Sequence, residues 1–471
     1  MSGKLKKYAN VKLMRCFVVG LIMWFMSGFV DLDVKAWHIF SVFIAVIISF
    51  ILRPYPLGMS VLMGILVLVG SQTITLKESL SGFSDTTVWL VIAAFLIADA
   101  VLKSGFGTRI ALYLVSKLGK SIKGIAYAVC GSEFLLASVI PSNTARGGGL
   151  HAPIVDSLVH SIEGASTKPA KAGRYLSLVG SHANLIAASM YMTGMAANPL
   201  VSKAASDIFG IDFGWGTWLL GSIIPGIVSL LLLPLLIYKL APPTIEESRV
   251  AQQSAAKQLA SKGPMGREEK IMMGVLAGLL LLWGTQFLHG LPTTLIAWIG
   301  VAVLLLSNTQ TWDDIISNAK AWDTLFWLGG LLTMASMLSK YGFIQWFVDQ
   351  SQNVVGPFSG IWIIIILGLI YFYSMYAFSM LSGHIAAMVA PFFAVCLAAN
   401  ASPMLTVAVF AYFSCLCGCM TNYSSGPVII YYGLGYETSQ RWFRIGFLVS
   451  LAHITVWLGI GLLWWKVLGW W

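Results

Sequence analysis

The chain has 471 residues, of which 58% are hydrophobic and only 10% are charged, and its formal net charge is +10. A water-soluble domain carries about 25% charged residues, so this composition excludes a soluble protein. The surplus of lysine and arginine lies in short loops between apolar runs. Such a distribution is typical of a membrane protein, and we expect no nucleic-acid partner.

Apolar runs long enough to span about 30 Å of hydrocarbon begin near Cys16 and continue to Trp465. Basic residues precede the first run and no small-residue cleavage site follows it, so we expect a retained helix rather than a signal peptide. The six cysteines show neither a disulfide framework nor zinc-site spacing. We therefore predict a chain of membrane helices with no metal and no cofactor.

One unusual pattern occurs twice in this chain. Its two copies are Asp85, Thr86, Trp89, Leu90 and Asp323, Thr324, Trp327, Leu328. A polar, helix-breaking segment follows each copy, at 141–149 in the first and at 382–384 in the second. A further pair of interruptions lies at 198–199 and 426–427. Paired interruptions in corresponding places of two halves indicate the central binding site of a secondary transporter.

The charges of the loops assign the two sides of the membrane. If the amino terminus is cytoplasmic, alternating spans place Lys120, Arg174 and the polar stretch 242–270 on the same side. This agreement requires that the segments around Ser142 and Ser382 each enter and leave the membrane on one side. We predict an all-α polytopic membrane protein with about eleven transmembrane helices and two re-entrant hairpins.

The same topology makes the repeat inverted. The Asp85 segment enters the membrane from outside, whereas the Asp323 segment enters it from inside. An inverted repeat provides two half-sites related by an axis in the membrane plane. Moving one part of the protein against another then presents the combined site to either side.

The chemistry of the interruptions indicates an anionic ligand. Pro141 and the glycines at 147–149 leave backbone groups unpaired, which costs several kcal/mol for each group in lipid, so this segment must line a cavity. Hydroxyls, an amide side chain and free N–H groups near the positive end of a helix suit carboxylate oxygens. Two such half-sites facing each other suit a ligand with a carboxylate at each end.

These residues resemble the divalent-anion:sodium symporter family of dicarboxylate transporters. That family has a Ser-Asn-Thr triplet at the tip of each of two opposed hairpins and a proline-containing break in a later helix of each repeat. Residues 142–144 match the first triplet, and 196–199 and 424–427 match the two breaks. The resemblance covers nearly the whole chain. The sequences of these motifs are most similar to those of the exchanger branch, which includes citrate:succinate and tartrate:succinate antiporters and the plastid 2-oxoglutarate/malate translocator.

The resemblance implies a homodimer and an elevator motion of a transport domain against a scaffold. It places scaffold helices in 1–119 and 271–349, transport-domain segments in 120–240 and 350–471, and a cytoplasmic linker in 241–270. The substrate-binding residues that it implies are Ser142, Asn143, Thr144, Ala197, Asn198, Pro199, Ser382, Gly383, His384, Ser424, Ser425, Gly426 and Pro427.

One departure from the family pattern concerns the coupling ion. The second triplet reads Ser382, Gly383, His384, so the asparagine oxygen that would help to hold sodium is missing. We expect His384 and Arg146 to compensate the charge of a dianion instead. A fixed charge in an empty site costs at least about 2.5 to 3.5 kcal/mol near mid-membrane, which disfavours return of the empty carrier and makes exchange obligatory.

The sequence thus predicts a carrier in the cytoplasmic membrane of a prokaryotic cell. It would exchange malate, succinate, fumarate or 2-oxoglutarate, and citrate and tartrate stay open as substrates. A sodium-coupled or proton-coupled symporter, with His384 as the proton carrier, is the alternative. An intramembrane enzyme is disfavoured because no span carries paired His and Glu at helical spacing. A channel suits duplicated, inverted sites less well than alternating access does.

Overall fold

The structure is a computed structural model that describes residues 3–163, 171–244, 247–355 and 360–471. The described residues fold into helices, and the one strand-like pairing among them is an isolated bridge between Ser121 and Glu247. The predicted all-helical class is therefore confirmed.

Seven helical segments in the described part of the chain are long and apolar enough to cross a membrane. They are Val11–Phe29, Val34–Leu52, Thr86–Ser104, Trp215–Leu240, Leu381–Ala398, Pro403–Met420 and Ser439–Val467. Three shorter apolar helices cover Leu57–Gly70, Thr293–Leu306 and Ile361–Ala377. The total of eleven spans and two hairpins stays a prediction.

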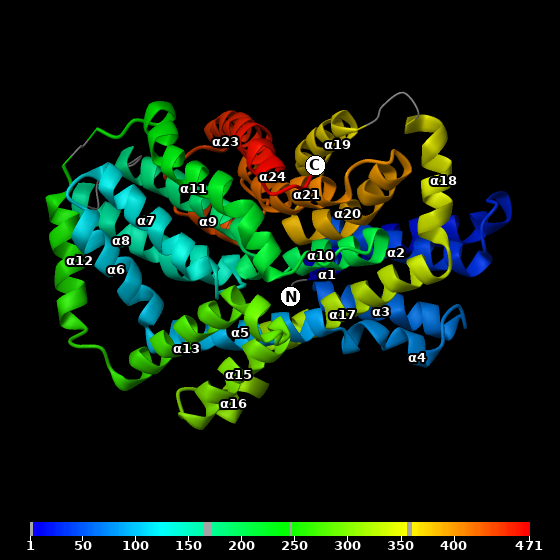
Figure 1. Cartoon of the computed structure of the whole chain (residues 1–471), viewed down its shortest axis with the longest axis horizontal. Helices are drawn as coiled ribbons and strands as arrows, with labels where there is room; N and C mark the ends of the chain where they lie inside the picture. Colours follow the sequence, from blue (N-terminus) through cyan, green and yellow to red (C-terminus); the bar gives the residue numbers. More distant parts are fainter. Residues whose placement is uncertain (1–2, 164–170, 245–246, 356–359) are drawn as a thin grey trace.

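The helices pack as two layers, which lie one above the other in Figure 1. The first layer is made of α2 (Val34–Leu52), α3 (Leu57–Gly70), α4 (Leu76–Ser79), α5 (Thr86–Ser104), α13 (Arg267–Gly284), α14 (Gln286–His289), α15 (Thr293–Leu306), α16 (Trp312–Ile316) and α17 (Ala319–Lys340), with α1 (Gly3–Phe25) packed on α2.

The second layer contains the broken helices. It is made of α7 (Ile122–Ala137), α8 (Ala152–Glu163), α9 (Lys171–Met190), α10 (Asn198–Phe209), α11 (Trp215–Leu240), α19 (Ile361–Ser374), α20 (Leu381–Ala398), α21 (Pro403–Leu416), α22 (Gly426–Gly433), α23 (Ser439–Thr455) and α24 (Leu462–Val467). Three helices run between the layers at the two ends of the molecule: α6 (Phe106–Leu118), α12 (Arg249–Ser261) and α18 (Phe343–Val355).

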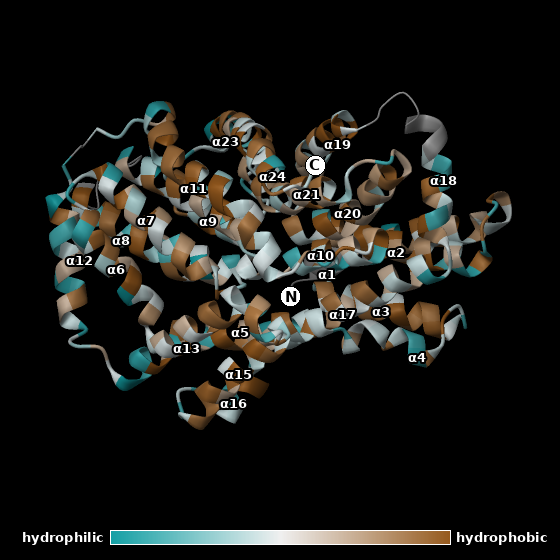
Figure 2. Ribbon diagram, in the orientation of Figure 1, coloured by the Kyte–Doolittle hydropathy of each residue, from teal (hydrophilic) through white to brown (hydrophobic). Residues whose placement is uncertain are grey.

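Hydrophobic residues run along the helices of both layers (Figure 2), and many of the large ones are exposed on the outside. Phe17, Leu66, Leu231, Leu281 and Ile370 each expose more than half of their surface. Water does not favour so many large exposed hydrophobic residues, whereas the hydrocarbon of a bilayer does. The polar stretch expected as a linker contains α12, which packs against α6 and α8 through its buried face.

The chain leaves regular helical geometry at the predicted interruptions. Helix α7 ends at Ala137, and π-helical turns begin only at Thr144. Helix α9 ends at Met190 and α10 begins at Asn198, while α21 ends at Leu416 and α22 begins at Gly426. In the second half the break before α20 lies at 375–380, so residues 382–384 are in the first turn of that helix and not in the break. Prolines and glycines explain three of these breaks because they remove helical hydrogen bonds or favour other backbone angles, whereas residues 375–380 include neither.

Candidate functional site

A cavity of about 310 Å³ lies between the two layers, where the breaks converge. The second layer contributes Pro141, Ser142, Asn143, Thr144, Met195, Ala196, Ala197, Met380, Leu381, Ser382, Ser425 and Gly426 to its lining. The first layer contributes Phe95, Lys320, Asp323, Thr324 and Trp327. Segments from both halves of the chain therefore meet at one site.

Two buried polar groups in this lining have no partner among the described residues. They are Nδ2 of Asn143 and Oγ of Ser425, and these residues are 8% and 6% exposed. A buried polar group without a hydrogen bond costs about 1–3 kcal/mol. The two groups are therefore ready to bind a molecule in the cavity, and one comes from each half of the chain.

A buried ion pair contacts the first break on the side away from the cavity. Arg146 and Glu133 are both fully buried, and Nε of Arg146 donates to Oε2 of Glu133 at 2.6 Å. Nη1 of Arg146 donates to the carbonyls of Ile140, at 2.7 Å, and Gly194, at 3.1 Å. These two carbonyls belong to the two interruptions of the first half. The guanidinium thus satisfies backbone groups that would otherwise be unpaired in the membrane.

Asn184 and His151 complete this network around Glu133. Nδ2 of Asn184 lies 3.0 Å and 3.2 Å from the two carboxylate oxygens and donates to the carbonyl of Asn143 at 3.2 Å. Nδ1 of His151 lies 2.9 Å from Oε1 of Glu133, and its Nε2 lies 2.7 Å from Oγ of Ser132. The network therefore connects α7, α9 and the segment that carries Asn143. We call Glu133, Arg146, His151 and Asn184 the Glu133 network.

The structure brings about half of the residues expected at the site to the cavity. Those in its lining are Ser142, Asn143, Thr144, Ala197, Ser382, Ser425 and Gly426. Those outside the lining are Arg146, Asn198, Pro199, Gly383, His384, Ser424 and Pro427.

Two of the residues outside the lining hold the breaks in shape. Nδ2 of Asn198 donates to the carbonyls of Ala188, at 2.9 Å, and Tyr191, at 3.0 Å, at the end of α9. Oγ of Ser424 donates to the carbonyl of Gly418 at 2.6 Å. Because these contacts satisfy carbonyls that the interrupted helices release, Asn198 and Ser424 stabilise the site from behind.

The two residues expected to compensate charge are also set back from the cavity. His384 is fully buried, with Nε2 at 2.8 Å from Oγ of Ser374 and 3.1 Å from the carbonyl of Tyr371. The charge of Arg146 is balanced by Glu133. In this conformation neither side chain reaches the cavity, so any effect of theirs on a bound anion acts through the segments that they support. Their charge-compensating role stays a prediction.

Sequence reasoning missed Glu133 and did not assign Lys320, Asp323, Thr324 or Trp327 to the site. Glu133 had a usable signal, since an acidic residue inside an apolar run is expensive in a membrane and implies a partner. The duplicated Asp323 segment was recognised as a repeat, but its contact with the cavity depends on how α17 packs.

Gly426 is needed where the two halves meet. A Cβ at this position would lie only 2.2 Å from Oγ1 and 2.9 Å from Cβ of Thr144, so rotation of the threonine cannot relieve the clash. We expect Gly426→Ala to separate the two half-sites and to reduce transport at least tenfold, as measured by uptake into proteoliposomes. Gly433→Ala is the matched control at the other end of α22, where nothing lies within 4 Å. Equal transport by both variants would contradict the assignment.

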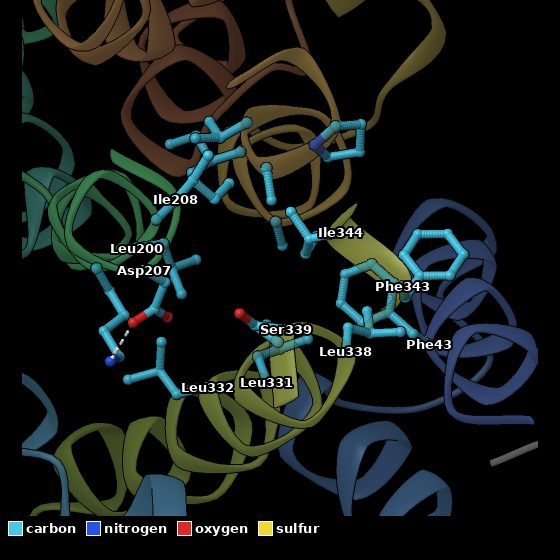
Figure 3. Close-up of a pocket in the computed structure, with 18 of the residues that line it drawn as sticks. Phe43, Leu200, Asp207, Ile208, Leu331, Leu332, Leu338, Ser339, Phe343 and Ile344 are labelled. Carbon is cyan, nitrogen blue, oxygen red and sulfur yellow. Dashed lines mark hydrogen bonds and ion pairs between the residues drawn. The ribbon is translucent and has the colours of Figure 1, made fainter. Parts of the chain in front are cut away.

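A second, mainly apolar crevice of about 70 Å³ lies between the layers farther along α17. Figure 3 shows Leu200, Asp207 and Ile208 on one side of it and Leu331 and Leu332 on the other. Smooth apolar surfaces of this kind provide little directional bonding between the layers. Polar contacts join the layers at other places among the described residues. They include Lys203 with Asp85, at 3.8 Å, and the side chain of Arg53 with the carbonyl of Ser379, at 2.6 Å.

Interrupted helices, a buried ion pair and an apolar exterior define a multi-pass integral membrane protein, and its two layers enclose a cavity with hydroxyl and amide groups in the lining. Comparison with solved structures finds the same fold in the MtrF protein of Neisseria gonorrhoeae, at a TM-score of 0.59 and 13% identity over 85% of this chain and 84% of that one. The same comparison finds this fold in the YdaH transporter of Alcanivorax borkumensis, at a TM-score of 0.58 and 16% identity over 85% of this chain and 89% of that one.

The family follows from sequence comparison. A family model described as the sodium:sulfate symporter transmembrane region matches residues 7–471. The chain is 41% identical to a Bacillus subtilis protein provisionally named malate transporter YflS, over 100% of this chain and 99% of that one. It is 37% identical to the chloroplastic dicarboxylate transporter 1 of Spinacia oleracea, over 98% of this chain and 82% of that one. It is 31% identical to the L-tartrate/succinate antiporter of Shigella dysenteriae, over 93% and 94%.

The chain therefore belongs to the sodium:sulfate symporter family, the family that its motifs resemble, in which these relatives are dicarboxylate transporters. All three relatives are named as transporters rather than enzymes.

Proposed function

We propose that this protein exchanges C4 and C5 dicarboxylates across a cell membrane by one-for-one antiport without sodium. The observation that carries the proposal is the cavity in which Asn143 and Ser425, from different halves of the chain, leave buried polar groups unpartnered. One carboxylate binds at 142–144 and the other at Ser382 and Ser425. Malate, succinate, fumarate and 2-oxoglutarate have this two-ended shape, and citrate and tartrate extend the class.

The size and polarity of the cavity support a small ligand. Its volume of about 310 Å³ lies at the lower end of the range of about 300–1,000 Å³ for small-molecule sites. Hydroxyls of Ser142, Thr144 and Ser382 and the amide of Asn143 are donors of the kind that carboxylates accept. Lys320 adds positive charge to the same lining. The names of the malate, dicarboxylate and tartrate/succinate relatives agree with this class of substrate.

Sodium independence rests on the second half-site. Gly383 has no side-chain oxygen, and His384 directs its Nε2 toward Ser374 and Tyr371. Sodium requires several oxygen ligands, which this position does not supply from its side chains. The competing function is sodium-coupled or proton-coupled symport with the same substrates.

For the motion, we propose that the second layer slides against the first as an elevator. The first layer would be the scaffold expected in 1–119 and 271–349, apart from α6 and α18, and it would also form a homodimer interface. The second layer would be the transport domain expected in 120–240 and 350–471. The amino terminus would be cytoplasmic. The apolar crevice and the few polar links between the layers support this division, because little directional bonding has to break when the layers slide.

The function is tested by uptake of labelled malate, succinate and 2-oxoglutarate into proteoliposomes. The vesicles are empty or preloaded with unlabelled dicarboxylate, in buffers with and without sodium. We expect uptake only into preloaded vesicles, at the same rate in both buffers. Uptake into empty vesicles that requires sodium or an imposed pH gradient would instead establish symport.

The sliding of the layers is tested by cross-linking Asp85→Cys to Lys203→Cys with a short bismaleimide. These positions lie in different layers, with Nζ of Lys203 at 3.8 Å from Oδ2 of Asp85. We expect the cross-link to stop exchange in labelled-substrate assays, because α10 can no longer move relative to α5. The control joins Lys103→Cys to Asp314→Cys within the first layer, where the native side chains are 2.6 Å apart. Continued exchange by the interlayer cross-linked protein would exclude the motion.

A further inference from the structure

The cavity receives a cation from the layer that does not carry the breaks. Lys320 lies in the first turn of α17 and lines the cavity opposite the segments with Asn143 and Ser382. We propose that Lys320 is a docking residue for the substrate anion and that it acts on only one side of the membrane. This inference rests on the proposed function and adds to it a difference between the two faces of the carrier.

The ammonium group of Lys320 is available for this role. Lys320 is exposed, and no ion pair of its side chain occurs within the described ranges. The neighbouring carboxylate, Asp323, is directed toward the start of α3, because its Oδ1 lies 2.6 Å from where a Cβ of Gly58 would be. A dianion that enters the cavity therefore meets a positive charge that no nearby carboxylate neutralises by direct contact.

The duplication shows why the charge is present at one end only. Lys320 precedes Asp323 by the same number of residues as Gly82 precedes Asp85, so Gly82 is its counterpart in the first copy. A side chain cannot fit there, since a Cβ on Gly82 would lie 2.1 Å from the carbonyl oxygen of Gly329. The packing of the first layer thus excludes a second lysine at the repeat-related position.

The cavity beside Asp85 has a different charge. This cavity, of about 320 Å³, is lined by Asp85, Asp212 and Lys203 among other residues. The ammonium of Lys203 is already paired, at 2.6 Å from Oδ1 of Asp207 and 3.8 Å from Oδ2 of Asp85. The Asp85 end therefore offers two carboxylates and a neutralised lysine, whereas the Lys320 end offers one carboxylate, Asp323, and an unpaired lysine.

The consequence for transport follows from the separation of the layers. Lys320 belongs to the first layer, so it does not travel with a substrate held by the second layer. It attracts the dianion when the cavity faces the Lys320 end and has no contact with it at the other end. Attraction by an exposed charge raises the rate of encounter and weakens as salt is added. Loss of the lysine should therefore raise KM at one face and leave the maximal rate unchanged.

The experiment compares inside-out with right-side-out membrane vesicles, each preloaded with malate. KM and maximal rate for labelled malate are measured at low and high ionic strength. For Lys320→Gln we expect KM to rise about 3- to 10-fold in one orientation, with less effect of salt than in the wild type, and no change in the other. Lys320→Glu should give a larger rise in that same orientation, and Lys320→Arg should behave as the wild type.

The matched control is Lys77→Gln, which removes a lysine that lines neither cavity. It should leave KM unchanged in both orientations. An equal rise of KM in both orientations for Lys320→Gln, or no rise in either, would overturn the inference while exchange itself stays intact. Absence of exchange by the wild-type protein would instead contradict the proposed function.

Discussion

Glu133→Ala is expected to abolish exchange and to lower the free energy of unfolding by about 3–5 kcal/mol. The substitution leaves the guanidinium of Arg146 buried without its carboxylate, and it removes acceptors from Asn184 and His151. The carbonyl of Asn143 then loses the well-positioned donor Asn184, so the segment that carries the side-chain amide of Asn143 changes shape. Unfolding by SDS, followed by circular dichroism, and uptake into preloaded proteoliposomes measure the two effects.

Glu247→Ala is the matched control, because Glu247 forms an ion pair at 3.7 Å with Arg249 in which both side chains are more than 70% exposed. An exposed pair contributes about 0–1 kcal/mol, so this variant should behave as the wild type. A double variant, Glu133→Gln with Arg146→Met, removes both charges. It should recover much of the stability without recovering transport, since the carbonyls of Ile140 and Gly194 still lose their donor. Normal exchange by Glu133→Ala would exclude the positioning role.

The second large effect is expected at Asn143. Replacing its amide with alanine removes a donor to a carboxylate, and a hydrogen bond to a charged group contributes about 1.5–3 kcal/mol, so KM should rise about 10- to 100-fold. Asn143→Asp keeps the shape and places a negative charge beside the dianion. That variant should bind still more weakly than Asn143→Ala. KM and maximal rate for malate, measured by uptake into preloaded vesicles, give both values.

Asn400→Asp is the control for the isosteric change, because Asn400 is exposed in a turn with positive φ, where aspartate is also tolerated. It should leave KM unchanged. If Asn143→Asp transported malate with wild-type KM, the dicarboxylate would have to bind elsewhere.

Local sequence patterns predicted the breaks well. Pro141, Pro199 and Pro427 are helix breakers whose effect is confined to their neighbours in sequence, and the chain leaves regular helical geometry beside each of them. The break before α20 was placed a few residues too late. The prediction placed this break at 382–384 because these residues correspond to the first triplet. The actual turn, at 375–380, has no proline to mark it.

The directions of side chains could not be predicted in the same way. Asn198 and Asn143 are both asparagines at interruptions, yet Asn198 donates to carbonyls of its own break, whereas Nδ2 of Asn143 is left for the cavity. Which of these occurs depends on the neighbouring segments in space. Glu133 contacts Arg146 and Asn184 only because α7 packs against α9 and the segment that follows the first break. Lys320 lines the cavity only because α17, in the other layer, packs opposite the breaks.

The most direct measurement is a structure of the purified protein with bound 2-oxoglutarate. The account predicts one carboxylate within hydrogen-bond distance of Nδ2 of Asn143 and the other beside Oγ of Ser425, with the ligand inside the cavity between the layers. A ligand bound elsewhere, with Asn143 and Ser425 still unpartnered, would contradict the account.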